Sequence, residues 1–274
     1  MLKGFKNAAE LDFTIDENKV KMEEAFQLVE KEKGSVFPLI INGERIETEK
    51  KITSLSPATK EVLGYACSCS QELAEKAIQG ANEAFKKWSV TPLEERARAL
   101  RKLARLVEEN RYYIDAWNVE ESGKNWGEAD GELCELLDFI NSYVMHMNNL
   151  EKGLELVPTD EYTKCIYIPI GVGVAVPPWN FPLSLIGGMV AAAVVTGNSI
   201  VCKPSSDSPI VAYKFVELCE KAGIPAGVVN YIPGSGSDIG DFIVEHPLTR
   251  FINFTGSKEI GCRINEHAAK ISKG

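Results

Sequence analysis

Asn180 is the residue best placed to take part in a reaction, because it stands in the proline-stiffened segment "PPWNFP" at 177 to 182, just before a long apolar run. A side-chain amide held on a rigid turn could donate a hydrogen bond to an oxyanion forming on a substrate, since a preorganised donor needs no reorganisation during reaction. The same asparagine could instead cap a helix that begins near residue 183, with Pro182 in its first turn. The segment alone leaves both interpretations open.

Lys203 is a second candidate, because it ends the apolar stretch "SIVCK" and is followed by Pro204. A lysine at the carboxyl end of a buried parallel strand points into the ligand crevice of an open sheet. There its ammonium can donate to ribose hydroxyls or to a phosphate. The alternative is a lysine whose stem lies along the end of the sheet while its charge reaches solvent.

Two further strand ends carry glycines, which allow unusual backbone conformations, or residues with a hydroxyl group. The segment "GSGSDIG" at 234 to 240 is one residue longer than the dinucleotide fingerprint and follows a third strand, so alone it predicts equally well a turn that needs positive φ. Ser257 follows Thr255 and Gly256 where a strand gives way to a helix, and free N–H groups at such a start can hold a phosphate. Ser257 could also simply cap that helix.

The elements that position these residues alternate from Gly171 onward. Apolar, β-branched segments predict strands at 171–177, 198–204, 227–233 and 250–256, and the segments between and after them predict helices at 183–196, 209–222, 237–245 and 257–269. This alternation is typical of parallel βαβ units buried on both faces, which bind ligands at the carboxyl ends of their strands. Asn180, Lys203, the segment 234–240 and Ser257 each follow the carboxyl end of one of these predicted strands.

The sequence pattern before residue 160 is different. Charged segments there predict helices at 17–33, from Ser70, from Thr91, and at 128–150. Ser70 is expected to cap its helix, and Thr91, Pro92 and Glu94 predict a capping box with proline at the first helical position. An Asn42-Gly43 pair predicts a hairpin, and 151–170 a second one. We therefore expect two domains, a helical lobe with a small sheet at 1–160 and a Rossmann-type sheet at 161–274.

Composition limits the partners. The chain has 274 residues and a net charge of -9, which argues against nucleic acid or an anionic membrane, because both reward clustered lysine and arginine. Its 7 cysteines and 3 histidines show no zinc-site spacing, so no metal is expected, and scattered cysteines predict reduced thiols and a cytoplasmic location. The apolar run at 183–201 is interrupted by Gly197 and Asn198, which favours a buried helix and strand over a membrane span. A small molecule is the expected partner.

Four motifs in one order carry a resemblance to a known family. They are PWNFP at 178–182, KPS at 203–205, the Pro-Gly-Ser-Gly turn at 233–236, and FTGS at 254–257. Together they closely resemble the aldehyde dehydrogenase superfamily, and "PLIINGER", "SPATKEVLG" and the segment at 228–264 are most similar to its 1-pyrroline-5-carboxylate dehydrogenase branch. The resemblance implies an α/β fold with a parallel Rossmann-type sheet, helices on both faces and a helical amino-terminal lobe.

The resemblance also assigns roles to the residues around the reacting aldehyde. It makes Asn180 the oxyanion-hole amide, lets Trp179 frame the cofactor pyrophosphate, and places Phe181 along the aldehyde tunnel. Glu128 would belong to the substrate channel of this branch, although a position on a surface helix is equally compatible with the sequence.

For the dinucleotide, the resemblance implies that Lys203 holds the adenine-ribose hydroxyls, Gly236 allows close approach of the adenosine half, and Ser257 binds phosphate. Ser206 stands where many relatives carry a glutamate that rejects a 2'-phosphate. The resemblance implies NAD as the cofactor, and Ser206 in place of that glutamate leaves NADP open as well.

Two catalytic parts of the family do not occur in this sequence. The nucleophilic cysteine lies in a G-Q-x-C type segment and the general base in an E-x-G-G-K type segment, and neither pattern is found between 1 and 274. The resemblance thus implies the amino-terminal part of an enzyme that oxidises glutamate semialdehyde to glutamate, inactive by itself. It also implies a homo-oligomer in the full-length form, with the hairpin at 151–170 at subunit contacts. The alternative is a non-catalytic NAD-binding or interaction module derived from that family.

Overall fold

The computed structural model describes residues 5–155 and 163–270, and its centre is a six-stranded sheet of order β11-β8-β9-β10-β2-β3. Strands β11, β8, β9 and β10 run parallel, and β2 pairs antiparallel with β10. The elements of this second half of the chain are β8 (Val172–Val176), α6 (Ser184–Val195), β9 (Ser199–Cys202), α7 (Pro209–Ala222), β10 (Val229–Tyr231), the π-helical turn η1 (Gly236–Gly240), α8 (Asp241–Glu245), β11 (Thr249–Phe254) and α9 (Lys258–Lys270).

The first half of the chain supplies most of the helical cover and a second, three-stranded sheet of order β1-β5-β4. Its elements are α1 (Asp16–Glu32), β1 (Ser35–Phe37), β2 (Leu39–Ile41), β3 (Glu44–Ile46), β4 (Lys51–Leu55), β5 (Val62–Cys67), α2 (Gln71–Trp88), α3 (Leu93–Glu109), α4 (Arg111–Ser122), α5 (Trp126–Leu150), β6 (Leu154–Glu155) and β7 (Lys164–Cys165).

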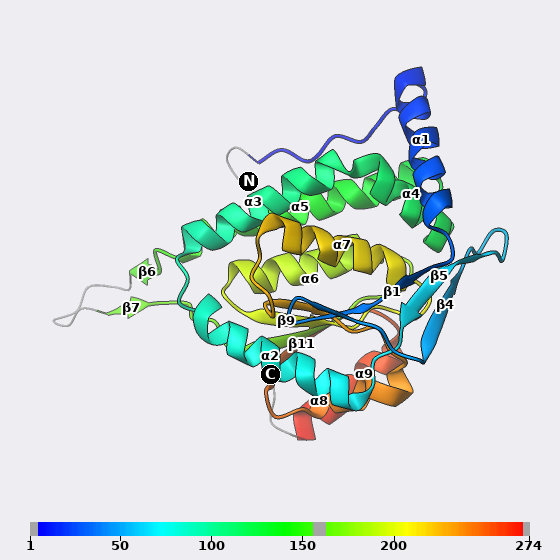
Figure 1. Cartoon of the computed structure of the whole chain (residues 1–274). Helices are drawn as coiled ribbons and strands as arrows, with labels where there is room; N and C mark the ends of the chain where they lie inside the picture. Colours follow the sequence, from blue (N-terminus) through cyan, green and yellow to red (C-terminus); the bar gives the residue numbers. More distant parts are fainter. Residues whose placement is uncertain (1–4, 156–162, 271–274) are drawn as a thin grey trace.

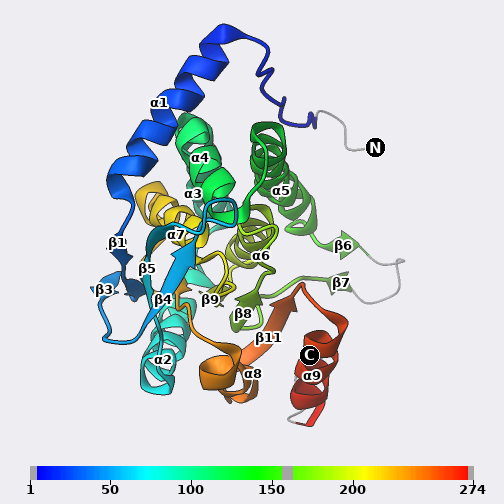
Figure 2. The same ribbon diagram turned by 90° about the vertical axis from the view of Figure 1, so that its right-hand side faces the viewer.

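The layers follow from which helix covers which face of the central sheet (Figure 1). Helices α6 and α7 cover one face, α2 and α8 cover the other, and α3, α4 and α5 form an outer layer over α6 and α7. The view from the side shows the same order of layers, with α1 along the outside of α4 (Figure 2). The expected α/β fold with helices on both faces of a parallel sheet is confirmed.

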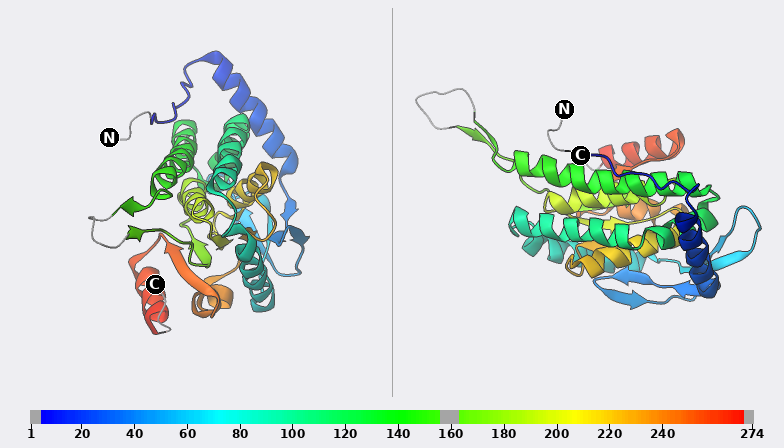
Figure 3. Two further views of the ribbon diagram at one scale, coloured as in Figure 1. Left: turned by 90° about the vertical axis from the view of Figure 1, so that its left-hand side faces the viewer. Right: turned by 90° about the horizontal axis from the view of Figure 1, so that it is seen from above.

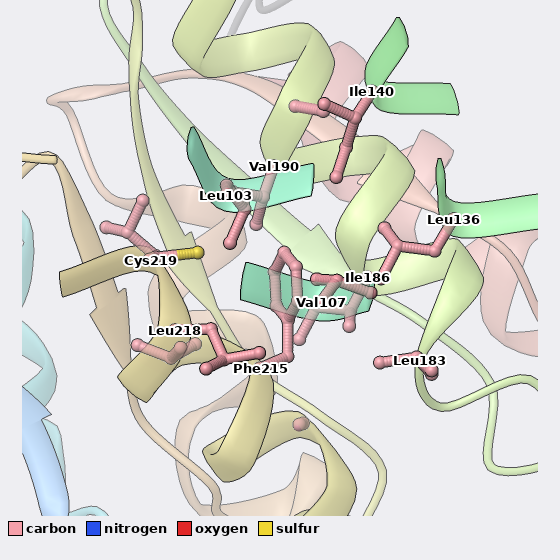
Figure 4. Close-up of a cluster of buried hydrophobic side chains, with 14 of the residues drawn as sticks. Leu103, Val107, Leu136, Ile140, Leu183, Ile186, Val190, Phe215, Leu218 and Cys219 are labelled. Atoms are coloured by element: carbon pink, nitrogen blue, oxygen red, sulfur yellow. The ribbon is translucent and has the colours of Figure 1, made fainter. Parts of the chain in front are cut away.

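The main core lies between the outer helices and α6 and α7 (Figure 4). Leu103, Leu136, Ile186 and Phe215 meet there and are fully buried. Gly187 permits the close approach of α6 to α5, because a Cβ at this position would lie 2.1 Å from Leu136 Cδ1. The outer layer is therefore packed tightly on the helix that follows the "PPWNFP" segment.

The Asn42-Gly43 turn joins β2 to β3 as the sequence predicts, with φ of 55° and 81° at the two residues. Its position was not anticipated, since Ile40 of β2 pairs with Tyr231 of β10 and extends the central sheet. Residues before 160 thus complete the sheet of the second half. The boundary near residue 160 stays a prediction.

One local expectation for the helices is confirmed, one is wrong, and one helix was not predicted. Ser70 caps α2 by accepting a hydrogen bond from the backbone of Leu73. The capping box at Thr91 does not form, because the Thr91 hydroxyl donates instead to the carbonyl of Lys87 in the preceding helix, and α3 begins without a side-chain cap. Helix α4 was missed, although Gly123, which ends it at a φ of 75°, is its sequence signal.

The second expected hairpin is partly described. Strands β6 and β7 pair antiparallel and project from one end of the molecule (Figure 3), whereas residues 156–162 lie outside the described part of the chain.

Candidate active site

Asn180 lies on an exposed turn between β8 and α6, with Trp179 and Phe181 exposed on either side of it. The interpretation of Asn180 as a helix cap is wrong, because α6 begins after Leu183 without a side-chain cap from its own segment. A carboxylate from another helix takes that place: Glu132 Oε1 accepts the backbone N–H groups of Leu183 at 2.8 Å and Ser184 at 3.0 Å. The side-chain amide of Asn180 is therefore not needed by the helix.

Lys124 holds the same turn from the α4–α5 junction. Its Nζ donates to the backbone carbonyl of Asn180 at 2.5 Å, forms an ion pair with Glu132, and lies 4.4 Å from the centroid of the Phe181 ring. The side chain of Glu132 is fully buried, and its second oxygen also accepts from Asn118 Nδ2 at 2.7 Å. Sequence reasoning missed both residues, because their partners lie about fifty positions away.

A cavity of about 530 Å³ opens beside this turn. It brings together three of the residues predicted for the aldehyde site, Glu128, Asn180 and Phe181. Glu128 also completes a capping box with Asn125 at the start of α5, so its carboxylate has a structural role as well. The cavity is lined by Glu10, Ser122, Lys124, Glu128, Gly131, Glu132, Glu135, Asn180 and Phe181.

Lys203 lies at the carboxyl end of β9 and is only 8% exposed. This burial lowers the pKa of its ammonium below the ordinary value for lysine. Within residues 5–155 and 163–270, no side chain or carbonyl is found as a hydrogen-bond or ion-pair partner for its Nζ. A largely buried lysine whose ammonium has no protein partner among the described residues is suited to a ligand that accepts hydrogen bonds. Ser206 is half-buried in the loop that follows.

The glycine segment forms the π-helical turn η1, which Ser235 caps by accepting from the backbone of Asp238 at 3.1 Å. The interpretation as a turn with positive φ is wrong, because Gly234, Gly236 and Gly240 all lie outside that region. Gly234 packs closely against Ile239, because a Cβ at this position would lie 2.7 Å from Ile239 Cδ1. At Gly236 a Cβ would meet nothing within 4 Å in the described part of the chain, so its surface is open.

Ser257 caps the last described helix, because its hydroxyl accepts from the backbone of Ile260 at 3.3 Å. The residue is exposed, and it follows β11 at the same edge of the sheet as Lys203. The capping interpretation is thus confirmed, while a phosphate contact at this helix start stays a prediction.

A second buried glutamate fixes the loop that carries Lys203 and Ser206. Glu121 of α4 accepts hydrogen bonds from the backbone of Ile210 at 2.9 Å and Val211 at 2.8 Å, at the start of α7, and from Ser54 Oγ at 2.7 Å. The helical layer therefore holds the starts of both α6 and α7 through carboxylates. Each carboxyl group gives the N–H groups at a helix start the acceptor that the helix itself cannot supply.

Glu121 makes the stability of the chain depend on pH. Burial raises its pKa from 4.5 to about 7, so its contribution to the free energy of unfolding is complete below pH 4.5 and is lost as the pH rises to about 7. Between about pH 5 and about pH 8 the parent chain should lose stability, and Glu121→Gln should lose less of it, by about 2 to 3 kcal/mol. Urea unfolding across this range measures the difference. The exposed Glu72→Gln is the control, and identical pH profiles for all three proteins would contradict this role.

Most of the cysteines are buried. Cys67, Cys69, Cys134, Cys202 and Cys219 are buried, and only Cys165 and Cys262 of the 7 are exposed. Burial raises the pKa of Cys69 to about 12 and that of Cys134 to about 11. None of the seven lines the cavity beside Asn180. The expectation that the family's nucleophile lies outside this sequence stays a prediction.

The described residues form neither a metal site nor a membrane-spanning helix. Between residues 5 and 155 and between 163 and 270, no three or more histidine, cysteine, aspartate or glutamate side chains come together as ligands for a metal ion. Across these two ranges, every helix is too short or too polar to traverse a bilayer.

Known proteins resemble the chain in sequence and in structure. The 1-pyrroline-5-carboxylate dehydrogenase of Geobacillus thermodenitrificans is 48% identical over 276 aligned residues, which cover 100% of this chain and 54% of the relative. The crystal structure of 1-pyrroline-5-carboxylate dehydrogenase from Thermus with bound NAD matches with a TM-score of 0.94 at 39% identity, covering 97% of this chain and 52% of that one. Proline utilization A from Bdellovibrio bacteriovorus matches with a TM-score of 0.95 at 37% identity, covering 97% of this chain and 28% of that one.

The chain spans about half the length of the curated relatives it matches. Its residues 45–273 match the aldehyde dehydrogenase family. With the fold, the order of the motifs and these matches in agreement, the chain belongs to the aldehyde dehydrogenase family.

Proposed function

We propose that this chain carries the dinucleotide-binding sheet and one oxyanion donor of an enzyme that oxidises L-glutamate 5-semialdehyde, the open form of 1-pyrroline-5-carboxylate, to glutamate. The observation that carries the proposal is the clamped turn at Asn180, whose exposed amide stands beside a cavity shared with Phe181 and Glu128. The relatives named 1-pyrroline-5-carboxylate dehydrogenase support the choice of substrate.

In this proposal Asn180 donates a hydrogen bond to the aldehyde oxygen as it gains negative charge. A cysteine thiolate from outside this sequence adds to the aldehyde carbon, which makes that oxygen an oxyanion. Phe181 lines the tunnel through which the aldehyde enters, and Glu128 faces the same cavity. A donor that is already in place lowers the barrier because it does not have to reorient when the charge forms.

The residues at the sheet edge fit a nicotinamide dinucleotide. The buried ammonium of Lys203 suits ribose hydroxyls, the open surface at Gly236 admits the adenosine half, and Ser257 stands at a helix start suited to phosphate. Trp179 would border the pyrophosphate. When bound, the dinucleotide would be the oxidant, because its nicotinamide ring can accept a hydride, which is one proton with two electrons. Ser206 carries no charge that would repel a 2'-phosphate, so the proposal names NAD and also admits NADP.

The proposal extends to assembly and organisation. The segment after β7 exposes Ile166 (64%), Ile168 (72%) and Ile170 (56%), which supports the hairpin at 151–170 as a contact between copies in a homo-oligomer. We also propose that the helical lobe at 1–160 and the sheet at 161–274 are the two domains of this chain, and that the protein acts in the cytoplasm.

Replacing Lys203 should weaken dinucleotide binding. Lys203→Met removes a charged donor and should raise the Kd of the 274-residue chain for NAD by about 10- to 100-fold, as expected for a hydrogen bond from a charged group. Isothermal titration calorimetry measures this change. Methionine keeps the apolar stem of this largely buried side chain and removes a charge that burial disfavours, so the melting temperature should not fall and lost binding would not reflect unfolding. The exposed Lys102→Met is the control, and equal affinities for all three proteins would contradict the site.

The substrate is tested in a chimera in which this chain replaces the matching part of the Geobacillus thermodenitrificans relative. The expected result is formation of NADH that depends on glutamate semialdehyde, with no activity from the 274-residue chain alone. A chimera that folds and binds NAD but oxidises no glutamate semialdehyde would refute the proposed substrate.

A further inference from the structure

We propose that Lys124 is a positioning residue for Asn180. Its ammonium holds the backbone carbonyl of Asn180, and so fixes the peptide group between Asn180 and Phe181. This inference rests on the proposed function for its purpose, since only an oxyanion donor gains from a turn held still. The contacts of Lys124 are independent of that function and can be tested by themselves.

The backbone around Lys124 is fixed from both sides. The preceding residue, Gly123, ends α4 in the left-handed region, and its N–H donates to the carbonyl of Val119 at 2.9 Å. The following residue, Asn125, caps α5 in a reciprocal capping box with Glu128. A lysine between two capped helix ends has little backbone freedom, so its side chain starts from a rigid point.

The ammonium of Lys124 is fully occupied by the turn and its support. An ammonium has three donors, and here it faces the carbonyl of Asn180 at 2.5 Å, the carboxylate of Glu132, and the ring of Phe181 at 4.4 Å. Its side chain is 13% exposed. These contacts leave little capacity to bind a substrate anion, although Lys124 lines the cavity. The geometry therefore favours positioning over substrate binding.

The clamp has two points of attachment. Lys124 holds the carbonyl of Asn180, and Glu132, paired with Lys124, holds the backbone N–H groups of Leu183 and Ser184 three and four residues further on. Pro182 lies between them and restricts φ. The turn is thus tied at both ends to one buried ion pair, and the loss of Lys124 releases the end that carries Asn180.

The peptide plane that contains the Asn180 carbonyl also contains the N–H of Phe181, so the amide order parameter of Phe181 reports the contact directly. In ¹⁵N relaxation on the 274-residue chain, Lys124→Met should lower this order parameter from about 0.85 to below about 0.6. Lys124→Arg keeps a donor to the carbonyl and should restore at least half of the loss. Lys102→Met, an exposed lysine on α3, should leave it unchanged.

The inference is supported if the order parameters fall only within residues 179–184 in Lys124→Met and are restored in Lys124→Arg. An unchanged order parameter for Phe181 in a folded Lys124→Met chain overturns it, and so does an equal loss across the whole chain, which would indicate general loosening. NAD titration of the same samples keeps the two proposals apart. Failure of the parent chain to bind NAD would count against the proposed function and leave the result for the turn standing.

Discussion

Glu132→Ala should lower the free energy of unfolding of the 274-residue chain by about 3 to 5 kcal/mol, as expected when one partner of a buried ion pair is removed. The carboxylate accepts from the backbone of Leu183 and Ser184 and from Asn118, and it pairs with Lys124. Alanine leaves these donors without their acceptor in a site where water has little access. Urea unfolding with a constant slope gives the difference.

Glu135→Ala is the matched control for this prediction. Glu135 lies on the same helix and lines the same cavity, but it is exposed and its loss should change stability by no more than about 0.5 kcal/mol. Equal losses for the two variants would show that Glu132 does not carry the junction between α5 and α6. Glu132→Gln keeps an oxygen for the two N–H groups, so its loss should fall between the two.

Asn180→Ala in the chimera with the Geobacillus thermodenitrificans relative should lower kcat by about 100- to 1000-fold, the range measured when one oxyanion donor is removed. The hydrogen bond forms fully only as the aldehyde oxygen gains charge, so kcat should fall while KM for the aldehyde changes little. Steady-state kinetics with glutamate semialdehyde measures both constants.

Because of where Asn180 lies, an effect of Asn180→Ala on the reaction can be told apart from an effect on folding. Asn180 is exposed and does not cap α6, so Asn180→Ala should leave the melting temperature and the affinity for NAD unchanged. Asn148→Ala, an exposed asparagine on α5, is the control. A kcat within a factor of about 3 of the parent value would exclude Asn180 as a principal oxyanion donor, because that is under 1 kcal/mol of barrier.

The two glutamates of the outer helices share one structural principle. Glu121 and Glu132 reach from α4 and α5 to the starts of α7 and α6, and so fix the two loops that carry Lys203 and Asn180. The cofactor loop and the oxyanion turn are consequently oriented by the helical lobe as well as by the strands that precede them. This explains why both loops end at helices that lack a side-chain cap of their own.

The sequence by itself determined the order of strands and helices from β8 to α9, the hairpin turn at Asn42-Gly43, and the strand ends at which Asn180, Lys203 and Ser257 stand. These features depend on local rules, namely the two-residue period of a strand, the spacing of a helix and the φ preferences of glycine, asparagine and proline. The order of the motifs also led to the family, which the comparisons confirm.

Only the tertiary structure decided what holds those residues in place. Nothing near Leu183 or Ile210 in the chain predicts that Glu132 and Glu121, 51 and 89 positions earlier, replace the missing helix caps. Nothing near Lys203 in the sequence shows that this residue is only 8% exposed, and nothing near Tyr231 predicts that β2 joins its edge of the sheet. Such contacts depend on how layers pack across long sequence separations, and a free N–H group or a bare strand edge accepts any suitable partner that the packing brings within reach.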